Sequence, residues 1–162
     1  MKGAKVRNDV HKRDAFEADD ARNLLDSIDR STLSGKRDFA MIMLGIVCGL
    51  RIIEMQRADV KDIELKAGER VIYIQGKGHD EKDAYKKIPE GLYDAITAYL
   101  SARGCNSKHE PLFTAISNRA KGQRFSEPSI AKVIKDRMKA AGYDTHRLSA
   151  HSLRHTSVTF LL

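Results

Sequence analysis

The chain has 162 residues, of which 41% are hydrophobic and 31% charged. This length suffices for one domain with a substantial core, and the balance is that of ordinary globular proteins, which excludes a disordered chain. The longest apolar run, residues 39–50, is too short to span a bilayer, so a membrane-spanning segment is not expected.

The N-terminal residues are not predicted to fold, and together with the cysteines they indicate where the protein is located. Residues 1–15 are basic and polar without apolar periodicity, and we interpret them as a linker from a missing upstream module. Met1 is not followed by an apolar stretch, so no signal peptide is expected. Cys48 and Cys105 are far apart in the sequence, and both are interpreted as reduced thiols of a cytoplasmic protein.

Three helices are predicted in the first third of the chain. Apolar residues recur at helical spacing from Phe16 to Ile28, and Ser34-Gly35 is predicted to separate this helix from a largely apolar one over residues 36–49. Gly49 permits a helix stop, which places Arg51 at the beginning of a short third helix.

The middle of the chain predicts a small sheet. Val60, Ile63 and Leu65 are expected in a first strand, residues 71–74 in a second and residues 84–88 in a third, with a turn over residues 76–80 between the last two. Helices are then predicted over residues 89–102, from 126 to about 142, and from 149 onward, with residues 106–124 as a loop. The predicted fold class is α+β, mostly helical with a three-stranded antiparallel sheet.

Positive charge is concentrated toward the end of the chain. The net charge is +7, and residues 121–154 contain eight lysines and arginines against three acidic residues. A solvated basic face is the ordinary alternative, but this distribution favours binding to nucleic acid.

Arg51 is a candidate ligand for phosphate. Its guanidinium is a planar fork of donors that stays charged and matches two phosphate oxygens. Glu54 lies on the same helical face three residues later and could orient Arg51 or a neighbouring histidine. A purely structural Arg–Glu pair is the alternative.

Two further groups of residues are candidates for a catalytic role. Lys77 stands between two glycines at the predicted turn, where its ammonium could donate a proton to a leaving alkoxide, although such a lysine can also be merely solvent-exposed. On a helix, His151 shares one face with Arg154 and His155, which combines a proton shuttle with a charge clamp. The spacing of the histidines resembles a zinc site, but Ser152 replaces the glutamate that such a site needs, so no metal is expected.

Three motifs together resemble the tyrosine recombinase (phage integrase) catalytic domain. They are the segments 49–55 (GLRIIEM), 76–78 (GKG) and 151–155 (HSLRH), in family order and at family intervals, and the likeness covers residues 16–162. The resemblance implies DNA strand cleavage and rejoining without metal, ATP or any other cofactor, through a 3′-phosphotyrosyl intermediate. Double-stranded DNA is the implied partner, and the intact protein is expected to act as a tetramer on it.

The resemblance also implies roles for single residues. Arg51 and Arg154 would clamp the non-bridging phosphate oxygens, Lys77 would protonate the leaving 5′ oxygen, and His151 would be the acid/base partner of the nucleophile. Glu54 and His155 would support the site.

The sequence departs from the family pattern after the last motif. All five tyrosines precede it, so none is assigned as the nucleophile. Residues 1–15 are too short for the N-terminal DNA-binding module that family members usually have. We therefore expect a fragment, shortened at both ends, that is inactive alone and monomeric. A DNA-binding relative without chemistry and a type IB topoisomerase-like enzyme remain as alternatives.

Overall fold

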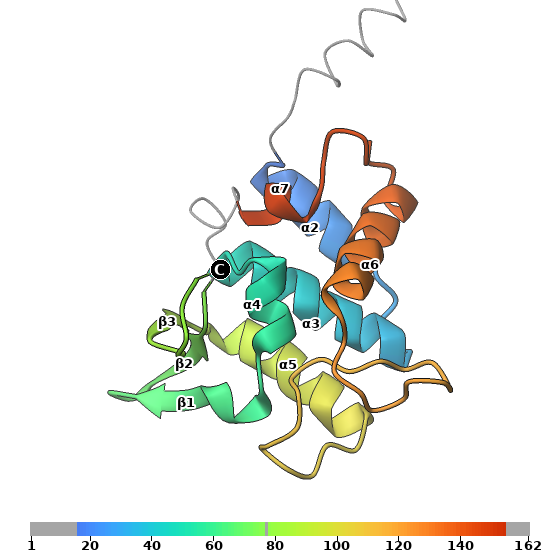
Figure 1. The fold of residues 1–162 in the computed structure, drawn as a ribbon. Helices are drawn as coiled ribbons and strands as arrows, with labels where there is room; N and C mark the ends of the chain where they lie inside the picture. Colours follow the sequence, from blue (N-terminus) through green and yellow to red (C-terminus); the bar gives the residue numbers. More distant parts are fainter. Residues whose placement is uncertain (1–15, 77, 155–162) are drawn as a thin grey trace, which may run out of the picture.

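Helix α3 (Leu33–Cys48) runs through the middle of the fold, as the computed structural model in Figure 1 shows. The structure describes residues 16–76 and 78–154. Most of α3 is buried because four other helices pack around it. These are α2 (Ala18–Asp26), α5 (Glu90–Ala102), α6 (Glu127–Ala140) and α7 (Ala150–Arg154).

The beginning of α3 differs from the prediction. Thr32 is the N-cap, and its hydroxyl accepts a hydrogen bond from the Gly35 amide at 3.0 Å. Ser34 and Gly35 therefore lie inside the first helical turn, and the prediction that they separate two helices is wrong. Gly35 stands there because a neighbouring backbone approaches it closely: a Cβ at this position would overlap the Asp29 carbonyl oxygen.

Replacing Gly35 by alanine should destabilise the fold by about 1–3 kcal/mol, because a backbone carbonyl cannot swing aside as a flexible side chain can. Gly91, in α5, is the matched control, since a Cβ there would meet only Met43 Cε, at 3.8 Å. Gly91→Ala should be neutral or stabilising by up to about 1 kcal/mol. Urea unfolding followed by circular dichroism measures both. Equal stability of the two variants would contradict the expectation.

Beyond α3 the chain forms a short helix and the sheet. Helix α4 spans Ile52–Arg57, and η1, a 3-10 turn, spans Val60–Asp62. Strands β1 (Ile63–Lys66), β2 (Glu69–Ile74) and β3 (Ala84–Lys87) pair antiparallel in that order. The register places Ile72 opposite Ile63 on one side and Lys86 on the other. This confirms the predicted fold class and the three-stranded sheet.

Val60 is not part of the first strand, contrary to the prediction. The Asp62 carboxylate accepts the Asp59 amide at 2.7 Å and closes the 3-10 turn. The Val60 amide donates to the Glu110 carbonyl, at 3.0 Å, instead of to a strand. Side-chain capping and a distant loop thus take up the backbone groups that a longer strand would have used.

A buried ion network joins α3 to α6. Both oxygens of the buried Asp38 carboxylate are 2.9 Å from an arginine Nε, one from Arg37 and one from Arg137. Arg37 also donates to the Thr114 carbonyl and lies over the Phe125 ring, with its Cζ 4.1 Å from the ring centroid. The charges are therefore compensated where they are removed from water.

None of the helices in the described part of the chain is long and apolar enough to cross a membrane.

Candidate phosphate-binding site

Arg51 lies where the sequence placed it, at the N-cap of α4. The preceding helix ends at Gly49, whose φ of 67° is a left-handed conformation that glycine adopts without strain. Glu54 is buried and accepts the Arg51 amide at 2.8 Å, and its second oxygen is 3.6 Å from Arg51 Nη1. About half of the Arg51 side chain remains exposed. Glu54 is therefore the ion-pair partner of Arg51.

Helix α7 brings Arg154 to the same place from the other end of the chain. Leu153 is fully buried and anchors the helix in the core. Arg154 Nε donates to the Gly49 carbonyl at 2.7 Å. A cation at the C-terminal end of α3 is favourable because the last carbonyls of a helix carry partial negative charge. This contact holds the Arg154 side chain beside the junction of α3 and α4.

Arg51, His151 and Arg154 line one open pocket of about 260 Å³. The predicted grouping of these three side chains is thus present in the structure. Glu127, at the start of α6, lines the same pocket and was not foreseen, because the sequence marks it only as a residue at a helix start. His151 is exposed and also borders a neighbouring pocket that contains Lys135. Within the described ranges, no three His, Cys, Asp or Glu side chains form a metal-binding group.

Lys77 and His155 lie outside the described residues, so their predicted places are not tested. The residue before Lys77 is close to the pocket, however, because a Cβ at Gly76 would be 3.6 Å from Glu54 Oε2. Other lysines of the sheet region are engaged. Lys82 Nζ is 2.9 Å from an Asp59 carboxylate oxygen and also binds Asp62, and Lys87 is 3.1 Å from Glu69.

The ion pairs around Lys82 affect its protonation. Burial alone would lower the pKa of the ammonium, but hydrogen bonds to Asp62 and Asp59 outweigh burial and raise it. Burial likewise acts to raise the pKa of the Asp59 carboxyl, and its hydrogen bonds to Arg124 and Lys82 lower it overall. Lys82 is thus held as a cation by its partners and is poorly suited to give up a proton.

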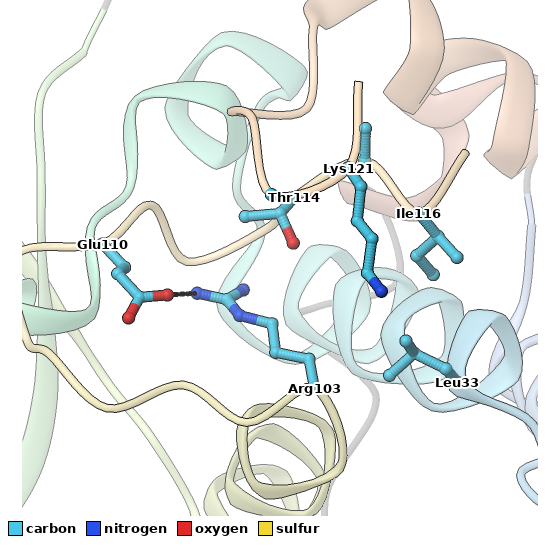
Figure 2. A pocket seen from close by; sticks show the side chains of 8 residues that line it. Leu33, Arg103, Glu110, Thr114, Ile116 and Lys121 are labelled. Atoms are coloured by element: carbon cyan, nitrogen blue, oxygen red, sulfur yellow. Dashed lines mark hydrogen bonds and ion pairs between the residues drawn. The ribbon is translucent and has the colours of Figure 1, made fainter. Parts of the chain in front are cut away.

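Another, smaller pocket lies away from these residues (Figure 2). It has a volume of about 100 Å³ between the start of α3 and the loop after α5, and Arg103 and Glu110 line it. Arg103 donates to the Tyr99 hydroxyl at 3.0 Å, and to the Leu112 and Pro111 carbonyls at 2.7 and 2.6 Å. These bonds to loop carbonyls show a structural arginine that fastens the loop to α5.

Comparison with known proteins identifies the family of this chain. The family model described as "Phage integrase family" matches residues 14–162, nearly the whole chain. The chain belongs to the phage integrase family. Among the curated relatives of this family member, "Tyrosine recombinase XerC" of Caldanaerobacter subterraneus subsp. tengcongensis is 31% identical over 143 residues, which cover 88% of this chain and 38% of the relative. A tyrosine recombinase of Synechococcus elongatus is 30% identical over 141 residues, which cover 87% of this chain and 43% of the relative.

Solved structures of recombinases share the fold. The XerA recombinase superposes with a TM-score of 0.68 at 26% identity, over 90% of this chain and 48% of that one. The XerH site-specific recombinase, solved in a post-cleavage complex with a palindromic difH substrate, has a TM-score of 0.70 at 23% identity, over 90% of this chain and 41% of that one. This phage integrase family chain thus spans less than half the length of these relatives.

Proposed function

We propose that this chain carries the phosphate-binding residues of a site-specific DNA recombinase, which cuts and rejoins double-stranded DNA through a 3′-phosphotyrosyl intermediate. The observation that carries the proposal is the pocket in which Arg51, His151 and Arg154 meet, although Arg51 is far from the other two in the sequence. Membership of the phage integrase family supports it. The net charge of +7 suits a polyanionic partner.

In the proposed reaction a tyrosine oxygen attacks the scissile phosphorus and the bond from phosphorus to the 5′ oxygen breaks. His151 takes the tyrosine proton, and Lys77 gives a proton to the leaving 5′ oxygen. Negative charge rises on the non-bridging oxygens in the transition state, and Arg51 and Arg154 donate to them there. Because Glu54 and the Gly49 carbonyl hold both arginines in advance, little reorganisation is needed when the charge develops.

The five tyrosines of this chain all lie within the described ranges and outside the pocket. Tyr73 and Tyr85 pack on each other with ring centroids 5.8 Å apart, and Tyr93 lies under Arg70. Tyr99 and Tyr143 are hydrogen-bonded to neighbouring elements. We therefore propose that the nucleophile belongs to a segment outside this chain. From the family resemblance we also propose that the intact protein acts as a tetramer on paired sites in the cytoplasm.

The proposal can be tested with a nicked suicide substrate, in which the released strand end diffuses away and the covalent intermediate accumulates. A binding site is first selected with the intact reading frame from a library of random duplex DNA. The intact protein should then form a covalent protein–DNA product that survives denaturing electrophoresis. The 162-residue chain should bind the same DNA without forming it, because positioning without a nucleophile makes no phosphotyrosine.

The outcomes separate the proposal from its alternatives. A covalent product from the 162-residue chain alone would contradict the assignment of an external nucleophile. DNA binding without a covalent product from the intact protein would favour a binding module without chemistry. For both chains the logarithm of the binding constant should fall by about 0.9 per neutralised phosphate for each tenfold rise in salt. Salt-independent binding would overturn both interpretations.

A further inference from the structure

The connection between β2 and β3 is held to α4 by an arginine in the last helical turn. Arg57 Nη1 donates to the Gly76 carbonyl at 2.9 Å and to the Gln75 carbonyl at 3.4 Å. The same Gly76 carbonyl accepts the His79 amide at 3.2 Å, and the Gln75 side chain donates to the His79 carbonyl at 2.8 Å. Arg57 thus binds the connection at the Gly76 carbonyl, which also accepts a hydrogen bond from within the connection.

The other arm of the connection is bound to the segment that follows α4. Lys82 Nζ forms ion pairs with Asp59 and Asp62, on either side of η1. The charged groups involved are only partly exposed, so these pairs are less screened by solvent than surface ion pairs. The short stretch from Arg57 to Asp62 therefore binds the connection at two places, at Gly76 and at Lys82.

This anchoring takes place next to the phosphate-binding pocket. A Cβ at Gly76 would lie 3.6 Å from the Glu54 oxygen that pairs with Arg51, as described above. Arg51 and Arg57 stand at the two ends of one six-residue helix. Because such a helix moves as a unit, fixing Gly76 to Arg57 also fixes it relative to Arg51.

We propose that Arg57 is a positioning residue for the proton transfer that accompanies strand cleavage. It sets the point of the backbone from which Lys77 extends, so that the Lys77 ammonium can give its proton to the 5′ oxygen as the bond to phosphorus breaks. The inference rests on the proposed function, since it requires Lys77 to be the proton donor. An arginine suits this task because its guanidinium stays charged and presents rigid donors to adjacent carbonyls.

The test compares two leaving groups in single-turnover cleavage by the intact protein. One substrate carries the natural 5′ oxygen at the scissile phosphate, and the other carries sulfur at that bridging position. A thiol has a pKa near 8.5, far below that of an alcohol, so the sulfur leaves without a proton. Arg57→Gln should slow cleavage of the oxygen substrate by about 10- to 100-fold, the effect of an ångström-scale misplacement. With the sulfur substrate its rate should return to near that of the wild-type protein.

Three further variants make the result specific. Lys77→Ala should show the same rescue by sulfur, whereas Arg51→Ala should stay slow on both substrates because its role is on the non-bridging oxygens. Arg70→Gln is the matched control, since Arg70 lies on β2 over the Tyr93 ring, with its Cζ 3.7 Å from the centroid. It should cleave both substrates at the wild-type rate.

The failures of the two proposals are distinguishable. If sulfur does not rescue Lys77→Ala, the assignment of Lys77 in the proposed function is wrong. If sulfur rescues Lys77→Ala but not Arg57→Gln, or if Arg57→Gln cleaves the oxygen substrate normally, the inference about Arg57 is overturned. Should Arg57→Gln not fold, Arg57→Lys, which keeps a donor for the Gly76 carbonyl, takes its place in the same two-substrate comparison, with a smaller expected loss.

Discussion

Replacing Arg154 by alanine in the intact protein should lower the rate of DNA cleavage by about 10²–10³-fold, or about 3–4 kcal/mol of transition-state stabilisation. The reason is that Arg154 is held beside Arg51 before the reaction, so its donors meet the rising charge without reorganising. Single-turnover cleavage of the suicide substrate measures this loss. Cleavage at a near-normal rate would show that Arg154 is not part of the clamp.

Two controls separate this loss from a loss of structure. The buried Leu153 should keep α7 docked in the variant, so non-covalent DNA binding and the midpoint of thermal unfolding should change little. Arg22→Ala removes an equally charged side chain that is half exposed on α2 and pairs with Asp19. This variant should cleave normally, which shows that the effect belongs to the position and not to the net charge.

Replacing Asp38 by alanine should lower the free energy of unfolding by about 3–5 kcal/mol, because it leaves the buried Arg37 without its counter-charge. For a chain of this size each kcal/mol corresponds to roughly 2–4 °C, so the midpoint of thermal unfolding should fall by about 10 °C. Urea and thermal unfolding of the chain measure both quantities.

Asp136→Ala is the matched control for Asp38→Ala. Asp136 lies on α6 and pairs with Lys132 at 2.7 Å, but its side chain is 58% exposed. Exposed pairs of this kind contribute at most about 0.5 kcal/mol. If the two variants were equally stable, the buried network would not be the element that joins α3 to α6.

The sequence was sufficient to predict the elements whose signal is local. Apolar spacing indicated the helices α2 and α5, and Gly49 indicated the break that places Arg51 at an N-cap. The grouping of Arg51, His151 and Arg154 could also be anticipated, but only from the motifs taken together. No periodicity or spacing states that residues so far apart in sequence share a pocket.

The features that the sequence did not predict depend on contacts between distant segments. Gly35 resembles a helix breaker in sequence, and only the approach of the Asp29 carbonyl explains it. Val60 has the character of a strand residue, but its amide is taken by the Glu110 carbonyl. Arg57 has no distinguishing sequence context, because its partners are backbone carbonyls, which every residue has.

The hydrogen bond from Arg154 to the Gly49 carbonyl has a consequence for protein synthesis. Its two residues are separated by 105 positions, so the contact cannot form until the chain up to Arg154 has left the ribosome. A nascent chain that exposes Arg51 and its helix still lacks the second half of the clamp. We therefore expect the proposed phosphate-binding pocket to be completed late during translation, only after the segment that carries Arg154 has emerged and packed against α3.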